Sequence, residues 1–428
     1  MKKFIKNLLL STFLFSSIFF TINTIEAKAT DLPPVYSEGA ILIDGRTGKV
    51  LFSKNEHTQF EPASTTKVMT ALIVLEHTNL EDKVTIGEKP PLVDGSAIGI
   101  REGEVYTVEE LMLGLLLESG NDCAEALAEY VAGSNEDFAK LMNAKAKELG
   151  ALNTTFKNPS GLHEDGHLTT AYDLALIMKE AAHNEDFVRI AQTESYKYVN
   201  QPFSDGSEKW ATNRNQLFNE YSPYFYDKTY CGKNGYTPEA NHSYTAAATK
   251  GDDMLIAAFL DATDKDNFYT NVGPLFNYGF DNFETLKLIS SGDTLYTYKI
   301  NDDVYIPLIA KNDFYYTKSK SEAEPNLSLD YEKTDISRQN IKTGDIIYKA
   351  KVNVNGETVS SMDLISAVDR EYSTADKIKD GFHDFLENPM NIMLAILGVV
   401  ILYIIIRMFI ISRRRKNIKR KKDKLFSR

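Results

Sequence analysis

The chain has only two cysteines among its 428 residues. Cys123 and Cys231 are too few for a disulfide-rich scaffold, so we expect two unpaired thiols, with a single bridge as the alternative. The 13 prolines and 24 glycines follow no period, which excludes a collagen-like fibre. With 43% hydrophobic residues the chain can bury a core, and its length fits about two to three domains.

Positive charge is scarce in the body of the chain. The formal net charge is −12, but residues 30–389 alone carry 33 basic and 58 acidic side chains. So acidic a body repels a phosphate backbone, which excludes nucleic acid as the partner. The basic residues gather instead at the two ends.

The amino-terminal end has the order of a secretory signal peptide. Three lysines precede an apolar run from Leu8 to Phe20, and Ala27-Lys28-Ala29 supplies the small residues of a cleavage site. We predict a signal peptide at residues 1–29; an uncleaved anchor is the alternative.

The carboxy-terminal end has the pattern of a membrane anchor. Met390–Ile411 contains one charge, Arg407, and as a helix it would cross a hydrocarbon core of ~30 Å. The basic residues 412–428 would stay in the cytoplasm by the positive-inside rule, and the body would lie outside the cell. A buried core helix is the alternative, but ten flanking basic residues disfavour it.

Hydrophobic periodicity between the two ends predicts two folded domains. Strand patterns come first and last with helical patterns between them, which indicates an antiparallel sheet covered by helices, in the α+β class. Short alternating runs then predict a small all-β domain. We divide the chain into a main domain at 30–283, an all-β domain at 284–370, a charged connector at 371–389, and the membrane helix at 390–411. Within the main domain we expect a hairpin at 39–52, helices at 64–77, 111–117, 122–130, 138–149 and 170–182, and two strands at 244–260.

Three short motifs could carry chemistry. Ser64 opens the first long helix, near free backbone N–H groups, and Lys67 lies one turn above it, where burial would make it a base. Ser119-Gly-Asn121 lies between two helices and could project a hydroxyl and an amide into a cleft. Lys233-Asn234-Gly235 stands before the late strands, where a glycine lets a ligand approach and a lysine attracts a carboxylate. Taken singly, each has a plainer interpretation: a helix cap, a turn in which Asn121 caps the next helix, and a charged turn.

Together the three motifs resemble those of the penicillin-recognising serine enzymes. The flanking sequences at residues 62–72, 117–122, 156–162, 168–173 and 278–284 are similar to the D-alanyl-D-alanine carboxypeptidases among the low-molecular-weight penicillin-binding proteins. The resemblance covers nearly the whole chain after the signal. It implies a penicillin-binding-protein or β-lactamase-like catalytic domain, followed by the all-β domain and the transmembrane helix.

The resemblance also implies a role for each motif residue. Ser64 would be the nucleophile and Lys67 its base, Ser119 would relay a proton, and Asn121 would orient the substrate and Lys67. Lys233 would attract the carboxylate of the terminal D-alanine. The backbone N–H groups of Ser64 and Tyr236 would form the oxyanion hole, beside Asn234 and Gly235. The substrate would be the stem peptide of peptidoglycan, β-lactams would acylate the serine, and no cofactor is implied.

The chain departs from the family pattern at two places. Asn234 replaces the usual threonine of Lys-Thr-Gly, and residues 261–264 lack an arginine that some relatives have. A β-lactamase is one alternative, although no deacylating Glu-x-x-x-Asn follows Ser119 at the expected distance. A catalytically weak penicillin-recognising protein is another, because of Asn234.

Two further matches are decoys. Lys342-Thr-Gly344 is a literal copy of the third motif, but it lies in the all-β domain, where we expect a hairpin turn. His163-Glu-Asp-Gly-His167 fits the zinc motif H-E-x-x-H, but that motif requires a helix, and Pro159, Gly161 and Gly166 predict a loop. We therefore expect no metal site.

Overall fold

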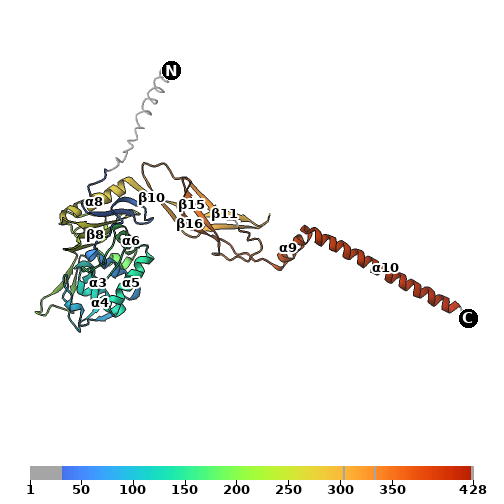
Figure 1. The fold of residues 1–428 in the computed structure, drawn as a ribbon, viewed down its shortest axis with the longest axis horizontal. Helices are drawn as coiled ribbons and strands as arrows, with labels where there is room; N and C mark the ends of the chain where they lie inside the picture. The colour runs from blue at the N-terminus through green and yellow to red at the C-terminus, as the bar shows by residue number, and fades with distance from the viewer. Residues whose placement is uncertain (1–30, 302–303, 332–333, 426–428) are drawn as a thin grey trace, which may run out of the picture. The chain divides into compact units, whose positions relative to one another are not determined.

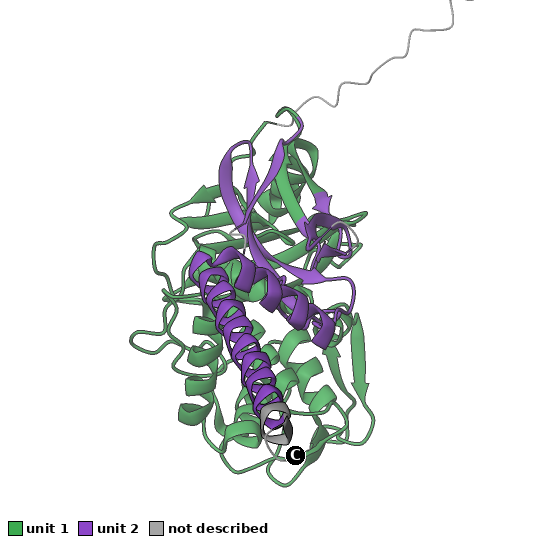
Figure 2. Cartoon of the chain, turned by 90° about the vertical axis from the view of Figure 1, so that its right-hand side faces the viewer, with its two compact units in different colours: residues 1–286, 315–323 green, residues 287–314, 324–428 purple. Residues whose placement is uncertain are grey.

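A computed structural model describes residues 31–301, 304–331 and 334–425, so the predicted signal peptide lies outside the described residues. Figure 1 follows the chain through its elements, and Figure 2 colours two compact units. Unit 1 extends to Leu286 and also includes Tyr315–Ala323; unit 2 contains Lys287–Phe314 and the chain from Glu324 onward. The chain therefore returns once to unit 1 before unit 2 is complete.

The centre of unit 1 is an antiparallel sheet of five strands in the order β2-β1-β9-β8-β7. Its members are β1 (Gly39–Asp44), β2 (Val50–Lys54), β7 (Thr229–Thr237), β8 (Asn241–Lys250) and β9 (Asp253–Ala262). The predicted hairpin and the two predicted late strands are confirmed as β1–β2 and β8–β9. Among the strands that the structure describes, β7 is at the edge of this sheet, so one side of its backbone has no strand partner there.

Helices cover both faces of this sheet because its strands are apolar on both sides. Along β1, Ile41 and Ile43 face one hydrophobic cluster, and Ala40 and Leu42 face another. The second cluster is closed by α8 (Lys265–Asn282). The first is closed by helices that confirm the predicted segments: α2 (Lys67–His77), α3 (Val108–Leu117), α4 (Asn121–Ala132), α5 (Asn135–Glu148) and α6 (Ala171–Ala182), with α7 (Glu185–Ala191) in addition. The α+β prediction is therefore confirmed.

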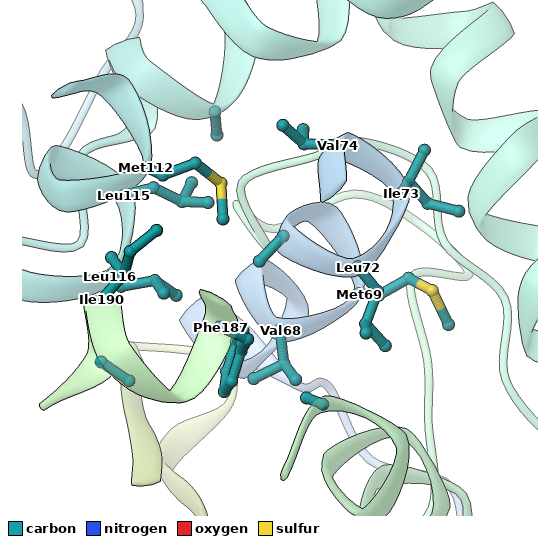
Figure 3. Packing of buried hydrophobic residues seen from close by; sticks show 14 of the residues in the cluster. Val68, Met69, Leu72, Ile73, Val74, Met112, Leu115, Leu116, Phe187 and Ile190 are labelled. Carbon is teal, nitrogen blue, oxygen red and sulfur yellow. The ribbon is translucent and has the colours of Figure 1, made fainter. Parts of the chain in front are cut away.

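Helix α2 is the central helix of the first cluster (Figure 3). Its buried side chains Val68, Met69, Leu72, Ile73 and Val74 lie among side chains of α3 and α7. Several neighbouring helices begin at caps that the sequence encodes; at α6 the hydroxyl of Thr170 accepts from the backbone N–H of Asp173, as predicted. This packing fixes the position of α2, which begins at Lys67, directly after the turn that contains Ser64.

Shorter elements complete unit 1. They are the 3₁₀ turns η1 (Ala63–Thr66) and η2 (Pro90–Leu92) and the two-stranded sheets of β3 (Lys83–Thr85) with β4 (Val105–Thr107) and of β5 (Ser195–Tyr198) with β6 (Lys209–Thr212).

Unit 2 confirms the predicted all-β domain. Its five-stranded sheet has the order β11-β12-β16-β15-β14, while a two-stranded sheet that pairs β10 with β13 has most of its residues in unit 1. The strands are β10 (Phe283–Ile289), β11 (Thr294–Lys299), β12 (Tyr305–Ala310), β13 (Phe314–Ser319), β14 (Leu327–Tyr331), β15 (Ile346–Val354) and β16 (Glu357–Ser366). Most of β13 belongs to unit 1, where Thr317 accepts a hydrogen bond from Lys49 in the β1–β2 turn.

The connector and the apolar segment are both helical. In α9 (Thr374–Glu387), Asp384 forms a two-point ion pair with Arg338 of the all-β domain. One residue later α10 (Pro389–Leu425) begins, and its segment 389–420 is long and apolar enough to cross a membrane, by length and composition. The two cysteines are buried free thiols, so the expectation of unpaired thiols is confirmed.

Candidate active site

Ser64 lies in a 3₁₀ turn that precedes α2. The sequence predicted an α-helix from Ser64, but α2 begins only at Lys67. The residue before Ser64, Ala63, is buried and has the left-handed φ of +47°. Two side-chain hydroxyls hold the turn by donating to the carbonyl of Pro62, that of Thr65 at 2.6 Å and that of Ser243 in β8 at 2.6 Å. Ser64 is thus presented, half-buried, on a strained and tightly held turn.

The amine of Lys67 is fully buried beside Ser64. Its Nζ lies 2.9 Å from Ser64 Oγ, 2.7 Å from Asn121 Oδ1 and 2.6 Å from the carbonyl oxygen of Ser160. Burial, followed by the charge of Lys233, lowers the pKa of Lys67 well below its usual value. No carboxylate contacts this amine among the described residues, so nothing adjacent requires it to carry a proton.

Asn121 reaches Lys67 from the start of α4. Its Nδ2 donates to the carbonyl of Asp94 at 2.7 Å, and its backbone N–H donates to the carbonyl of Ser96 at 2.6 Å. The interpretation of Asn121 as a helix cap is therefore wrong, since Gly120 holds the N-cap position of α4. Ser119 has a φ of +62° and is half-buried, and within the described residues its hydroxyl makes no hydrogen bond to Ser64 or Lys67.

Lys233 and Gly235 lie on the edge strand β7, so the interpretation of this motif as a turn is wrong. Lys233 is 1% exposed and its Nζ donates to the carbonyl of Asn234 at 2.9 Å. Burial lowers the pKa of Lys233 to about 7. A Cβ placed on Gly235 would lie 2.7 Å from the backbone nitrogen of Ser64, so the strand passes directly against the nucleophile turn.

Asn234 and Tyr236 point the other way. Side chains alternate along a strand, so these two lie on the face opposite Lys233 and Gly235. The ring of Tyr236, which is 57% exposed, lies 4.6 Å from that of His242. The structure thus brings Ser64, Lys67, Asn121 and the backbone of Gly235 together, while the Asn234 side chain lies off this cluster.

The two motif matches that we set aside, at residues 342–344 and 163–167, lie in a turn and in a loop. Lys342-Thr-Gly344 is a turn in unit 2, as expected, although the strand it precedes pairs with β14 and β16 rather than forming a hairpin with the preceding residues. His163 and His167 lie in a loop and point to different partners, Glu61 at 2.9 Å and Thr66 at 2.9 Å. Burial lowers the pKa of His167 to about 4, so it is neutral and supports the nucleophile turn.

The sequence did not indicate two groups that complete the site. The carbonyls of Ser160 and Asp94 each fix a side chain of the cluster, but every residue has a carbonyl, so no residue type marks them. The signal that was present is Gly161, which has a φ of +82° and whose Cβ would lie 1.9 Å from the carbonyl oxygen of Ala63. Only glycine allows the Ser160 loop to approach the nucleophile turn so closely.

Comparisons with known proteins agree with this geometry. A family model described as D-alanyl-D-alanine carboxypeptidase matches residues 26–264, and one described as penicillin-binding protein 5, C-terminal domain, matches residues 283–372. D-alanyl-D-alanine carboxypeptidase DacF of Bacillus subtilis is 31% identical over 399 residues, which cover 91% of this chain and 98% of that protein. DacC of Escherichia coli is 32% identical over 356 residues, covering 79% of this chain and 85% of that protein.

A solved structure shows the same likeness in three dimensions. Penicillin-binding protein 5 from Haemophilus influenzae aligns with a TM-score of 0.66 at 25% identity, over 79% of this chain and 99% of that one. The first family model alone matches more than half of the chain. The chain therefore belongs to the D-alanyl-D-alanine carboxypeptidase family of serine peptidases.

Proposed function

We propose that this carboxypeptidase forms an acyl-enzyme on Ser64, with Lys67 as the general base. The Ser64 oxygen would attack the carbonyl between two D-alanines and lose its proton to Lys67. The proton would then pass to the leaving D-alanine, with Ser119 as the relay. Water would hydrolyse the ester and restore the serine. The family membership and the contact of 2.9 Å between Lys67 and Ser64 support this sequence of steps.

The single observation that carries the proposal is the set of acceptors around Lys67. A neutral amine has two N–H groups and one lone pair. Asn121 Oδ1 and the Ser160 carbonyl are acceptors without hydrogens, so they take both N–H groups. The lone pair is left for the third neighbour, the Ser64 hydroxyl. These contacts support Lys67 as the base, because in the neutral amine they would leave the lone pair directed at Ser64.

The edge strand would bind the substrate. The backbone N–H groups of Ser64 and Tyr236 would stabilise the oxyanion, and the approach of Gly235 to Ser64 supports their placement together. Lys233 would receive the carboxylate of the terminal D-alanine. Two donors aimed at an oxyanion are worth several kcal/mol of activation barrier.

The substrate we propose is the pentapeptide stem of peptidoglycan, and β-lactams would acylate Ser64 as its mimics. Helix α10 would cross the membrane, with the basic residues after it in the cytoplasm and the catalytic unit outside. Its apolar length and the basic flank support this topology. We also retain the signal peptide at residues 1–29 as a proposal.

Two assays test this function against its alternatives. Release of D-alanine from a diacylated Lys-D-Ala-D-Ala peptide, together with stable labelling by a fluorescent penicillin, is the expected result. Rapid turnover of the penicillin without release of D-alanine would instead support a β-lactamase. Absence of both would support a weak binding protein. The family comparisons favour the carboxypeptidase.

We expect the KM for the peptide to rise with pH because of Lys233. The pKa of Lys233 is about 7, so the amine is charged below pH 7 and loses its attraction for the carboxylate above it. If only the charged form binds, KM rises about tenfold between pH 6 and pH 8. Lys67 acts as a base only when it is neutral. Protonation of Lys67 at acid pH would therefore lower kcat, whereas the titration of Lys233 changes KM.

Lys233→Arg is the control, because a guanidinium keeps its charge over this range. In that variant KM should stay constant between pH 6 and pH 8, whatever its absolute value. A rise in KM of the same size in both enzymes would show that Lys233 is not the titrating group.

We expect Asn234→Thr to raise the rate of D-alanine release by about threefold to tenfold. The short side chain of threonine keeps its hydroxyl beside the strand backbone, where it can reach a substrate carboxylate, whereas the longer Asn234 side chain lies off the Ser64 cluster on the opposite face of β7. Steady-state rates on the diacylated peptide measure the change. An unchanged rate would mean that this departure from the family pattern has no cost.

A further inference from the structure

Residues 94–100 form a loop held by a buried carboxylate. Asp122, in the first turn of α4, is 1% exposed. Its Oδ1 accepts from the backbone N–H of Ile98 at 3.2 Å and of Cys123 at 2.8 Å. Its Oδ2 accepts from Gly99 at 2.9 Å and Ile100 at 3.2 Å. Three consecutive N–H groups of the loop thus converge on one carboxylate.

A buried lysine binds the same segment through a backbone carbonyl. Lys209 of β6 is 0% exposed, and its Nζ donates to the carbonyl of Gly99 at 2.8 Å and to the Tyr106 hydroxyl at 2.9 Å. Glu104 lies 3.9 Å from this amine. The Gly99 peptide is therefore clamped between an anion on α4 and a cation on β6. Neither charge touches Ser64, Lys67 or Lys233 by any hydrogen bond in the described part of the chain.

The clamped loop contacts the active site through Asn121. The carbonyl of Asp94 accepts from Asn121 Nδ2 at 2.7 Å, and the carbonyl of Ser96 accepts from its backbone N–H at 2.6 Å. Because Asp94 supplies only an acceptor there, the amide must present its nitrogen to the loop and its oxygen to Lys67. The loop thereby decides which way the amide of Asn121 faces.

We propose that Asp122 and Lys209 are positioning residues, which clamp loop 94–100 so that Asn121 holds Lys67 in its reactive orientation. This inference rests on the proposed role of Lys67. Loss of the clamp would let the Asp94 carbonyl move and the Asn121 amide turn. Lys67 would then lose one of the two acceptors that direct its lone pair to Ser64. A misplacement of about 1 Å at a reacting group can cost about a hundredfold in rate.

The test compares Asp122→Asn and Lys209→Met in the full chain. In the first variant an NH₂ group would face backbone N–H donors, and in the second the Gly99 carbonyl would lose its donor. Active-site titration with a fluorescent penicillin counts the folded sites, and acylation rates are expressed per titrated site. At saturating penicillin we expect the rate constant of acylation to fall about tenfold or more in each variant. The dissociation constant of the noncovalent complex should change less than about threefold.

The double variant shows whether the two charges act through one loop. Effects through a shared loop are not additive, so the double variant should be no slower than the slower single variant. Lys145→Met is the matched control, because Lys145 is another buried lysine, paired with Glu76 at 2.6 Å on α2. It should acylate at the wild-type rate per site.

A wild-type rate constant per site in both single variants, with only a lower thermal midpoint, would make the clamp merely structural and overturn the proposal. A raised dissociation constant at unchanged rate constant, or additive effects in the double variant, would also overturn it. A failure of Ser64 itself to acylate in the wild-type chain would refute the proposed function instead.

A glycine pair keeps the proposal testable should Asp122→Asn not fold. Gly95 has a φ of +88° and is exposed, and a Cβ there would lie 2.7 Å from Asn121 Nδ2. Gly103 has a φ of +78° and open space around it. Gly95→Ala should slow acylation about tenfold and Gly103→Ala should not, because only the first displaces the amide. Equal rates in the two alanine variants would contradict the proposal.

Discussion

Lys67→Arg is expected to slow acylation by penicillin and release of D-alanine on the order of 10³-fold. A guanidinium stays protonated at every accessible pH and has no lone pair to accept the proton of Ser64. Burial already lowers the pKa of Lys67 well below its usual value, which is the state that a base requires and that arginine cannot reach. The rate of labelling by a fluorescent penicillin, measured per folded molecule, gives the result.

Lys145→Arg is the control for this substitution. Lys145 is also buried, but its amine lies between Glu76 and Glu148, where a permanent charge is favourable. It should leave acylation unchanged. A loss of less than tenfold in Lys67→Arg would mean that Lys67 supplies charge rather than abstracting a proton.

Gly161→Ala is expected to lower both the thermal stability of the protein and its labelling by penicillin. The new Cβ would lie 1.9 Å from the Ala63 carbonyl oxygen and 2.8 Å from Thr66 Oγ1, in a backbone with a φ of +82°. Either the Ser160 loop or the nucleophile turn must move, and each carries a contact to Lys67. We expect the temperature of half-maximal loss of labelling to fall by about 5 °C or more.

Gly166→Ala in the same loop is the control, because it introduces the same backbone strain without a steric clash of the new Cβ. Gly166 has a φ of +80°, but the nearest atom to its Cβ would be Lys157 Cε at 3.4 Å, an ordinary contact. This variant should lower the midpoint by much less and keep its acylation rate. Equal losses in the two variants would show that the approach of Gly161 to Ala63 has no special importance.

Residue types and spacing predicted most of the fold. Alternating strands and helical stripes predicted the hairpin, α2 to α6 and the all-β domain, because each burial pattern repeats within a few residues. The order of the three motifs also predicted that Ser64, Lys67, Asn121 and Lys233 would share one site. The return of residues 315–323 to unit 1 was not predictable, because it depends on a long-range contact with the β1–β2 turn.

The parts of the site that escaped prediction are those made by the backbone. The carbonyls of Ser160 and Asp94 orient Lys67 and Asn121, and no side chain marks either of them. The left-handed φ at Ala63 was equally hidden, because alanine rarely adopts it and tertiary contacts impose it. By contrast, the loop at 163–167 was predictable, because Pro159, Gly161 and Gly166 disfavour the helix that a zinc site needs.

The most direct measurement is the site of covalent attachment. The full chain is incubated with a penicillin, digested, and analysed by mass spectrometry, beside a Ser64→Ala variant whose fold is checked by its thermal midpoint. A single adduct on the peptide that contains Ser64, absent from the variant, is the predicted result. An adduct on any other residue, or labelling that persists in Ser64→Ala, would contradict the role of Ser64 as the nucleophile.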